Sequence, residues 1–341
     1  MSVSRSPETP SPEAGSRPTY RDRWRAWVDR WRAWVPSLKV QRTLALILLL
    51  CQGGITVTGS IVRVTGSGLG CNTWPNCHEG SLVPVAGAAP LVQQLIEFGN
   101  RLLTFVVAAA ALALCIALYK AFRRSELKLY AWISGLGIIL QAVIGGVSVL
   151  LDLRWWAVAV HFLPSMALVW IAALLYMRIA EPDDAEPLRV FSPAIRGAVA
   201  VAAIALCAVL VTGTMVTGSG PHPGDDGVGL DGRLELDTRI LTYVHAACMY
   251  VYLGLTAAAT FFLFRKKVPA DARRSAVVLL CMIVVQWAIG LTQYHLGVPR
   301  WTVPAHIAMS SVVVAFSSFL WAHGRRRIAL DAEKSRENAT A

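Results

Sequence analysis

The sequence predicts an all-α membrane protein, with eight transmembrane helices arranged as two pseudo-symmetric four-helix bundles. Three observations support this prediction. Of the 341 residues, 55% are hydrophobic and only 16% are charged, and the mean hydropathy is +0.52, outside the range of soluble globular domains. Apolar runs recur along the chain, each long enough to cross a bilayer core of about 30 Å. The chain also repeats itself at a shift of 145 residues.

The apolar runs define the eight predicted spans. They lie at about 43–62, 98–119, 129–151, 155–177, 195–217, 239–264, 275–296 and 302–322. Lipid offers no hydrogen-bond partners, so the backbone of each run must bond to itself, and a helix is the structure that does this within one segment.

Basic residues gather on one side of these spans. Before the first span they lie between Arg21 and Arg42. Between the second and third spans they are Lys120, Arg123, Arg124 and Lys128, and between the sixth and seventh they are Arg265, Lys266, Lys267, Arg273 and Arg274. Arg325, Arg326 and Arg327 follow the eighth span. The opposite side carries an acidic loop with Asp225, Asp226, Asp231, Glu235 and Asp237. The positive-inside rule therefore predicts a multi-pass protein of the cell membrane with both termini cytoplasmic. The net charge of +11 then reflects topology, and we expect no nucleic-acid partner.

Residues 1–42 are expected to form a cytoplasmic tail. Its first 20 residues are polar and predicted to be disordered. A tandem heptad follows at 23–35, in which Trp24, Trp27, Trp31 and Trp34 share one stripe with most of the arginines opposite. Such a helix would lie in the cytoplasmic headgroup layer as an anchor without chemistry of its own. Residues 324–341 form the second predicted tail.

The internal repeat divides the membrane domain into two halves, 43–178 and 195–323, joined by a cytoplasmic linker at 179–194. Four residues of the first half, Gln141, Gly145, Trp156 and His161, recur as Gln286, Gly290, Trp301 and His306. A glycine-rich sequence recurs as well: Thr58-Gly59 with Thr65-Gly66-Ser67-Gly68 is repeated as Thr212-Gly213 with Thr217-Gly218-Ser219-Gly220. Helical bundles build cofactor pockets from side chains on facing helices. Two related pockets are therefore predicted.

Three histidines lie at similar depth near the outer ends of their spans: His161, His245 and His306. His245 and His306 can face each other across a flat ring, and neutral imidazole is a good ligand for haem iron. In the first half, Asn100 takes the place of His245, so that pocket has one histidine. The alternative is that each histidine hydrogen-bonds a neighbouring helix. His78, His222 and His295 are expected to be solvated in outer loops or at a span end, and His323 to be structural.

Two features belong to the first half alone. Glu97 lies at the predicted lip of a span, on the helix face of Asn100, and Thr242 takes its place in the second half. A carboxylate there must be hydrated, paired or neutralised, and Arg101 is one available partner. The other feature is Cys71 and Cys77 in an outer loop, where a disulfide is favoured; a copper or zinc site that includes His78 is the weaker alternative. The other cysteines sit in spans as packing residues.

These residues carry a resemblance. The run Arg63-Val64-Thr65-Gly66-Ser67-Gly68-Leu69-Gly70-Cys71, with Trp74-Pro75, Cys77, Glu97 and Arg101, resembles the haem A synthase family of bacteria, and the similarity extends over about 43–323. The resemblance implies that His245 and His306 ligate haem b in the C-terminal half. It also implies that the N-terminal half receives haem O, whose C8 methyl is oxidised to a formyl group to make haem A for terminal oxidases. Glu97 matches the catalytic carboxylate of the family, and Cys71 and Cys77 match its disulfide.

One departure from the family pattern concerns the substrate pocket. Many members carry a histidine where this chain has Asn100, so here only His161 can bind the iron of haem O strongly. Asn100 on the distal side can hold a water, and water is the expected source of the formyl oxygen. The context suggests a haem O synthase and the cytochrome c oxidase assembly machinery as partners, beside the lipid bilayer. Two other classes stay open: a non-enzymatic b-type cytochrome electron carrier, and a transporter.

Overall fold

The computed structural model describes residues 19–225, 227–228 and 232–328, and almost all of its regular structure is helical. In chain order the elements are α1 (Tyr20–Ala33), α2 (Leu38–Val64), α3 (Leu91–Lys120), α4 (Ser125–Leu150), α5 (Trp155–Ile179), β1 (Pro187–Arg189), α6 (Pro193–Ser219), α7 (Thr238–Arg265), α8 (Ala270–His295), α9 (Thr302–His323) and β2 (Arg325–Arg327). Residues 1–18 and 329–341 of the two predicted tails, with Asp226 and Asp231 of the acidic loop, lie outside the described residues.

The eight helices from α2 to α9 are each long and apolar enough to cross a membrane. The prediction of eight spans is therefore confirmed. Several helices extend beyond the apolar runs: α3 begins at Leu91, seven residues before the predicted span, because helical hydrogen bonding continues past the point where the side chains become polar. This extension matters for Glu97, as described below.

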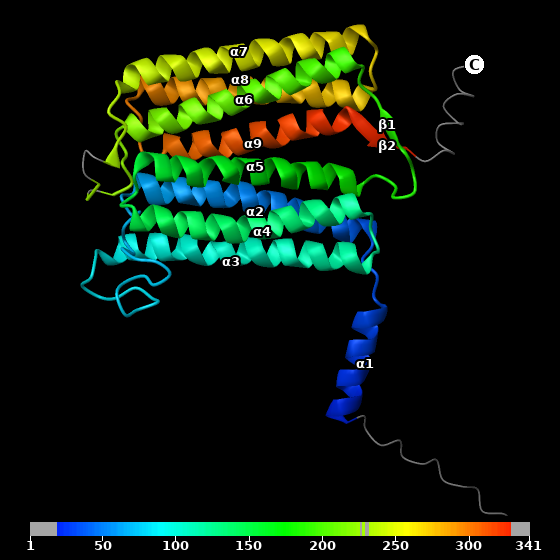
Figure 1. Cartoon of the computed structure of the whole chain (residues 1–341), viewed down its shortest axis with the longest axis horizontal. Helices are drawn as coiled ribbons and strands as arrows, with labels where there is room; N and C mark the ends of the chain where they lie inside the picture. Colours follow the sequence, from blue (N-terminus) through cyan, green and yellow to red (C-terminus); the bar gives the residue numbers. More distant parts are fainter. Residues whose placement is uncertain (1–18, 226, 229–231, 329–341) are drawn as a thin grey trace, which may run out of the picture.

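The eight helices run side by side in one elongated bundle (Figure 1). In the first half α2 packs against α3 and α5, and α4 packs against α3 and α5; in the second half α6 packs against α7 and α9, and α8 against α7 and α9. Helices α2, α5, α6 and α9 also pack across the boundary between the halves. The recurring pairings are those that two related bundles would produce, and their pseudo-symmetric arrangement stays a prediction.

Small residues occupy the contacts between helices. Ala173, Ala259 and Ala276 are fully buried, whereas Phe105 and Ile204 are about two thirds or more exposed on the outside of the bundle. Lipid-exposed surfaces need no polar cover, so large apolar side chains can point outward while small ones let helix backbones approach closely. This distribution is expected for helices in a membrane.

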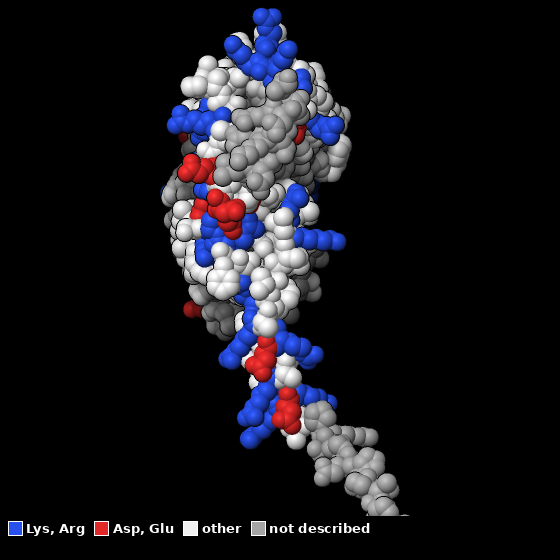
Figure 2. All heavy atoms as spheres, turned by 90° about the vertical axis from the view of Figure 1, so that its right-hand side faces the viewer, with Lys and Arg blue, Asp and Glu red and all other residues white. Residues whose placement is uncertain are grey.

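One end of the bundle is rich in arginine and carries α1, the linker between α5 and α6, and the strands β1 and β2, which pair antiparallel. Figure 2 views this arginine-rich end and shows basic side chains around its rim. Arg123 Nε donates to Asp183 Oδ2 at 2.6 Å, Arg124 Nη2 to Glu181 Oε2 at 3.0 Å, and Arg178 Nη1 to Glu181 Oε1 at 2.7 Å. We refer to these five residues as the linker clasp.

The opposite end, which we call the loop end, carries the connections between α2 and α3 and between α6 and α7. Within the first of these lies the Cys loop, residues 70–77. Its two cysteines, Cys71 and Cys77, form a disulfide with an S–S distance of 2.01 Å. The predicted disulfide is therefore present.

Candidate functional site

His245 on α7 and His306 on α9 face each other inside the second half. Their ring centres are 6.4 Å apart, and the ring planes are inclined by 58°. Each ring lies against a glycine of a neighbouring helix: a Cβ atom on Gly213 would lie 3.2 Å from His245 Cε1, and one on Gly290 would lie 3.1 Å from His306 Cε1. A larger residue at either glycine would press on the imidazole, so the repeated glycines make room for the rings.

The hydrogen bonds of His245 leave one ring nitrogen available. Its Nδ1 lies 3.1 Å from the carbonyl oxygen of Val209 and 3.2 Å from Thr212 Oγ1. Because a carbonyl oxygen only accepts, Nδ1 carries the proton and Nε2 keeps its lone pair. A metal-bound histidine usually donates its second nitrogen to such a carbonyl, which orients the ring. His245 is therefore arranged as a ligand through Nε2.

His306 is held by Gln286 on α8. The amide Nε2 of Gln286 lies 3.0 Å from His306 Nε2, donates to the main-chain oxygen of His306 at 3.2 Å, and donates to Ser310 Oγ at 2.8 Å. Two buried atoms of this group, His306 Nδ1 and Gln286 Oε1, have no hydrogen-bond partner among the described residues. Buried polar atoms are normally paired, so unpaired ones at a candidate ligand site need an explanation.

The second-half pair fits a haem held by two imidazoles. A metal bonded to one nitrogen of each ring at about 2 Å per bond separates the ring centres by about 6 Å, close to the observed 6.4 Å. Haem iron commonly takes histidine as its axial ligand. The unpaired atoms of His306 and Gln286 are also consistent with a site built for a further group.

The first half repeats these contacts around His161 on α5. A Cβ atom on Gly145 would lie 3.0 Å from His161 Cε1. Gln141 on α4 donates through Nε2 to the main-chain oxygen of His161 at 2.8 Å and also contacts Ser165 Oγ. His161 Nδ1 and Gln141 Oε1 are buried without partners among the described residues, as are their counterparts in the second half. The glutamine, serine and histidine thus recur as a unit at the 145-residue shift.

Asn100 on α3 takes, in the first half, the place that His245 has in the second half. Thr58 Oγ1 donates to Asn100 Oδ1 at 2.7 Å, which corresponds to the contact between Thr212 and His245. A Cβ atom on Gly59 would meet nothing within 4 Å, whereas one on the equivalent Gly213 would meet an imidazole. The first half therefore offers one imidazole at this depth and, on the other side, an amide with free space beside it.

The sequence predicted Glu97 at the lip of a span, whereas the structure places it inside α3. It is 5% exposed. Its Oε2 accepts a hydrogen bond from the Cys71 main-chain N–H at 2.6 Å, and its Oε1 accepts from Arg101 Nη2 at 2.6 Å. Arg101, the partner that the sequence left as an alternative, is the one that the structure shows. Both carboxylate oxygens are engaged, because a buried charge must be paired and hydrogen-bonded.

The Cys loop is attached to the first half by the same pair. Arg101 donates to the carbonyl oxygens of Cys71, Thr73 and Asn76 at 2.9 to 3.0 Å. The ring of Trp74 lies on α4, where a Cβ atom on Gly146 would be 2.2 Å from Trp74 Cδ2. Gly146 follows directly after Gly145, on which His161 rests, so the loop covers the outer side of the His161 region.

The metal site considered for this loop is not formed. Both thiols are used by the disulfide, and the described residues contain no group of three or more side chains that could hold a metal ion. The expectation that His78 is solvated is wrong: it is 7% exposed, and its ring nitrogens contact Asn72 Oδ1 at 3.1 Å and Gln94 Oε1 at 2.8 Å.

Gln94 is the residue that sequence reasoning missed. It is fully buried, donates to the carbonyl oxygens of Val85 and Ala89, and accepts from the Val85 N–H. Since its oxygen is an acceptor, His78 must donate through Nε2. The available signal was spacing, because Gln94, Glu97 and Arg101 share one face of α3. That polar face holds the connection between α2 and α3.

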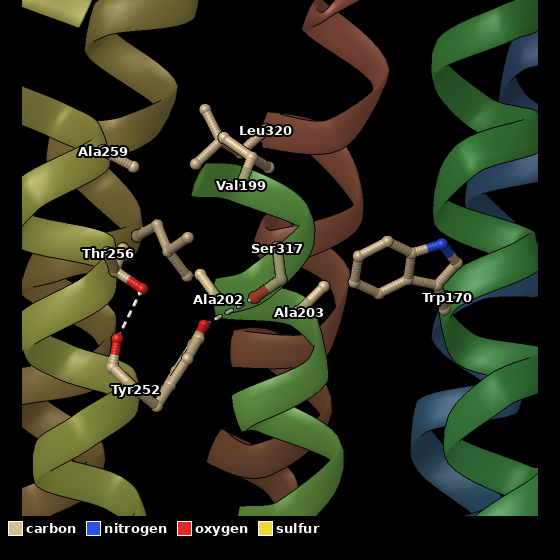
Figure 3. A pocket seen from close by; sticks show the side chains of 10 residues that line it. Trp170, Val199, Ala202, Ala203, Tyr252, Thr256, Ala259, Ser317 and Leu320 are labelled. Carbon is tan, nitrogen blue, oxygen red and sulfur yellow. Dashed lines mark hydrogen bonds between the residues drawn. The ribbon is translucent and has the colours of Figure 1, made fainter. Parts of the chain in front are cut away.

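A small cavity of about 10 Å³ lies deeper in the bundle, between α5, α6, α7, α8 and α9 (Figure 3). Tyr252 and Ser317 meet at its edge in a 2.7 Å hydrogen bond, and Trp170 approaches from the α5 side (Figure 3). A space of this size holds about one water at most. It is therefore no cofactor site.

The chain is similar to known proteins over about half its length. Residues 42–222 match the family COX15-CtaA, described as cytochrome oxidase assembly protein. A heme A synthase of Exiguobacterium sibiricum is 34% identical over 127 residues, 37% of this chain and 41% of that protein. A heme A synthase of Listeria welshimeri is 32% identical over 148 residues, 42% of this chain and 47% of that protein.

The aligned part thus spans less than half of the length of these relatives. The matched residues include the Cys loop, Glu97 and His161, which carried the resemblance in the sequence. Because the family match extends over more than half of the chain, this chain belongs to the COX15-CtaA family, the family of the haem A synthases that the sequence resembles.

Proposed function

We propose that this protein is a haem A synthase, which oxidises the C8 methyl of haem O to a formyl group and so supplies haem A to terminal oxidases. The observation that carries the proposal is the asymmetry of the two halves. The second half presents two imidazoles to one another, whereas the first half presents one imidazole opposite an amide, beneath a disulfide loop and a buried carboxylate. The two imidazoles of the second half suit a resident cofactor, and the single imidazole of the first half suits a substrate that must exchange.

In this proposal His245 and His306 hold haem b, and His161 binds the iron of haem O. Haem b, when bound, supplies one-electron redox chemistry whose potential depends on its axial ligands. The Val209 carbonyl fixes the orientation of the His245 ring, and Gln286 with Ser310 does so for His306. Asn100, with Thr58, leaves room for a water on the distal side of the substrate.

The reaction requires water and releases protons. Conversion of a methyl to a formyl group with water as the oxygen source releases four electrons and four protons in two successive two-electron oxidations, so an electron acceptor outside the protein must take up the electrons. Glu97 is the buried carboxylate on the Asn100 face of α3 and is the residue we assign to accept a proton at the reacting carbon or from water. Arg101 compensates its charge, and the Cys loop with Trp74 restricts entry of bulk water.

The membrane topology completes the proposal. The arginine-rich end is cytoplasmic by the positive-inside rule, which places the loop end and both pockets near the outer face of the cell membrane. A haem O synthase is then the expected source of substrate, and the assembly machinery of a cytochrome c oxidase is the expected destination of the product.

The main rival is a b-type cytochrome that only carries electrons. It accounts for His245 and His306 but gives no role to Glu97 or the Cys loop. To separate the two, the chain is expressed in cells that make haem O but lack their own haem A synthase, and extracted pigments are analysed by mass. A formyl haem only in cells with the protein is expected. Purified protein with a low-spin haem b spectrum but cells without formyl haem would favour the carrier.

A further inference from the structure

Helix α1 has no role in the proposed function. None of its residues is buried, and Trp24, Trp27 and Trp31 are each about half exposed. Large aromatic side chains gathered on an exposed helix face mark a surface that is covered by something in the working protein.

The order of residues around α1 is specific. At about 100° per residue, Trp24, Trp27 and Trp31 form one stripe. Arg23 and Arg30 lie on one flank of the helix beside this stripe, and Arg21, Arg25 and Arg32 lie on the other flank, with Arg25 nearest to the aspartates. Asp22 and Asp29 point in the opposite direction. The arginines therefore lie on both flanks of the helix, between the tryptophans and the aspartates.

The placement of α1 agrees with this order. In Figure 1, α1 runs across the direction of the bundle helices and extends sideways from their arginine-rich end. In Figure 2, which looks at that end, the acidic side chains of α1 lie along the middle of the visible face with basic side chains on both sides. A membrane crossed by α2–α9 would thus have α1 lying in its surface plane, with the aspartates turned away from the lipid.

Contacts with Lys120 and a short connection to α2 hold α1 at the arginine-rich end of the bundle. The Nζ atom of Lys120, at the end of α3, lies 4.0 Å from the centre of the Trp31 ring and 6.0 Å from that of Trp34. Only residues 34–37 connect α1 to α2, and four residues span at most about 14 Å. The helix therefore cannot leave the neighbourhood of the membrane surface.

We propose that α1 binds anionic lipid headgroups of the leaflet at the arginine-rich end. The tryptophan stripe enters the boundary between headgroups and acyl chains, which is the depth that tryptophan favours. The five arginines on its two edges lie at the level of the lipid phosphates and bind them, since a guanidinium matches phosphate geometry. A protein partner is less well matched, because basic side chains lie on both flanks of α1 and the helix runs across the end of the bundle (Figures 1 and 2).

The test measures the depth of two neighbouring positions in the full-length protein. The five unpaired cysteines are replaced by serine, and a spin label is attached either at Val28→Cys, next to Trp24 at the border of the stripe, or at Ala26→Cys, on the aspartate side. The protein is placed in nanodiscs of phosphatidylcholine, with or without phosphatidylglycerol, and collision rates with oxygen and with a water-soluble nickel chelate are compared.

We expect the label at position 28 to be shielded severalfold from the nickel chelate relative to the label at position 26, and this ratio to rise when phosphatidylglycerol is present. Replacing Arg23, Arg25 and Arg30 by glutamine should remove the rise. The matched control replaces Arg265, Lys266 and Lys267, which lie at the same end but outside α1, and should keep it.

Three outcomes would overturn the proposal. Equal nickel accessibility at positions 26 and 28 in anionic discs would place α1 in water. Shielding at position 28 that ignores both phosphatidylglycerol and the arginines would exclude anionic headgroups as the ligand. A label at position 28 that is shielded from both oxygen and the nickel chelate would assign the stripe to a protein contact instead, because oxygen is concentrated among lipid chains.

Discussion

At the scale of single residues, the recurring feature is an imidazole that rests on a helical glycine. This contact occurs at His161, His245 and His306. Asn100 breaks the series and leaves space beside Gly59. Because axial ligands decide what a haem iron can do, this single difference separates a closed pocket from an open one.

The second-half ligands can be tested spectroscopically. His245→Ala and His306→Ala each remove one of the two proposed iron bonds, so the low-spin spectrum expected for purified wild-type protein should be lost in either variant. His295→Ala, at the exposed end of α8, is the control and should leave the spectrum unchanged. If both single variants kept an unaltered low-spin haem, another pair of ligands would have to hold it.

The roles of Asn100 and His161 in binding haem O can be tested by comparing haem A formation in variants of each. His161→Ala should reduce haem A formation far more than Asn100→Ala, since only the imidazole binds iron strongly. Asn100→His should fill the space beside Gly59 and shift the spectrum of bound haem O toward low spin. A milder effect of His161→Ala than of Asn100→Ala would contradict the proposed ligand.

Glu97 tests the chemistry. Glu97→Gln keeps the shape of the side chain but removes its charge, and general acid–base catalysis typically contributes a factor of about 100 or more. We therefore expect haem A formation to fall by at least about this factor, with haem O accumulating and haem b retained. Arg101→Lys is the companion variant, because it keeps the positive charge but weakens attachment of the Cys loop.

The two variants separate catalysis from loop attachment. Near-normal haem A production by Glu97→Gln, together with a large loss in Arg101→Lys, would show that the pair only holds the loop. Mass analysis of extracted haems, with the haem b spectrum as the measure of folding, gives both readings from one preparation.

At the scale of elements, the linker clasp ties the linker at 179–194 to the first half at the arginine-rich end. Burial by itself would raise the pKa of Asp183, but hydrogen bonds from Arg123 and Arg124 outweigh this effect and hold the pKa below its usual value. Burial raises the pKa of Glu181, against the opposing effect of Arg178 and Arg124. Asp183 is thus the carboxylate whose ionised form the fold favours.

This assignment predicts a pH-dependent stability. A carboxylate whose folded pKa is depressed stabilises the protein above its unfolded pKa, about 3.9 for aspartate, and this contribution is lost as the pH falls through the folded pKa. Asp183→Asn should therefore lower the stability by about 1 kcal/mol at neutral pH, and the difference should disappear as the pH falls through the folded pKa of Asp183. Thermal unfolding of the purified protein measures it. Asp184→Asn, at the exposed neighbouring position, should have no effect at either pH.

At the scale of the whole molecule, the two halves meet at the loop end through their glycine-rich connections. The Gly68 N–H donates to the Gly224 carbonyl oxygen at 2.9 Å, Asp225 Oδ2 accepts from the Leu69 N–H at 3.3 Å, and Arg63 Nη2 donates to the Thr217 carbonyl oxygen at 3.0 Å. The repeated phrase that ends α2 and α6 thus forms the junction between the halves, next to the Cys loop.

The orientation of the whole chain predicts how its disulfide reacts. Cys71 and Cys77 should resist alkylation in intact cells until a membrane-impermeant reductant is added, since the loop end is proposed to face outward. The Cys71→Ser/Cys77→Ser double variant should keep haem b but lose part of its activity, because the loop shapes the first pocket only. Thiols that react from the cytoplasmic side, without prior reduction, would reverse the proposed topology.

The sequence by itself determined the class of the molecule. Apolar runs, the 145-residue repeat and the Cys loop together predicted eight helices, the disulfide and the family, since each depends on residues close together in the chain or on a fixed period. It also named the histidines, because rare polar residues within apolar spans stand out. The contacts made by these residues depend on helices that are distant in sequence.

Only the tertiary structure decided those contacts. The sequence predicted Glu97 at the lip of a span, whereas in the structure it is buried and accepts a hydrogen bond from the Cys71 backbone, 26 residues away. His78, expected in water, became buried against Gln94, and Gln286 was found to contact the ring of His306. Periodicity shows which face of a helix is apolar, but which neighbouring helix or loop covers a polar group depends on packing between distant segments, and so does the partner that satisfies it.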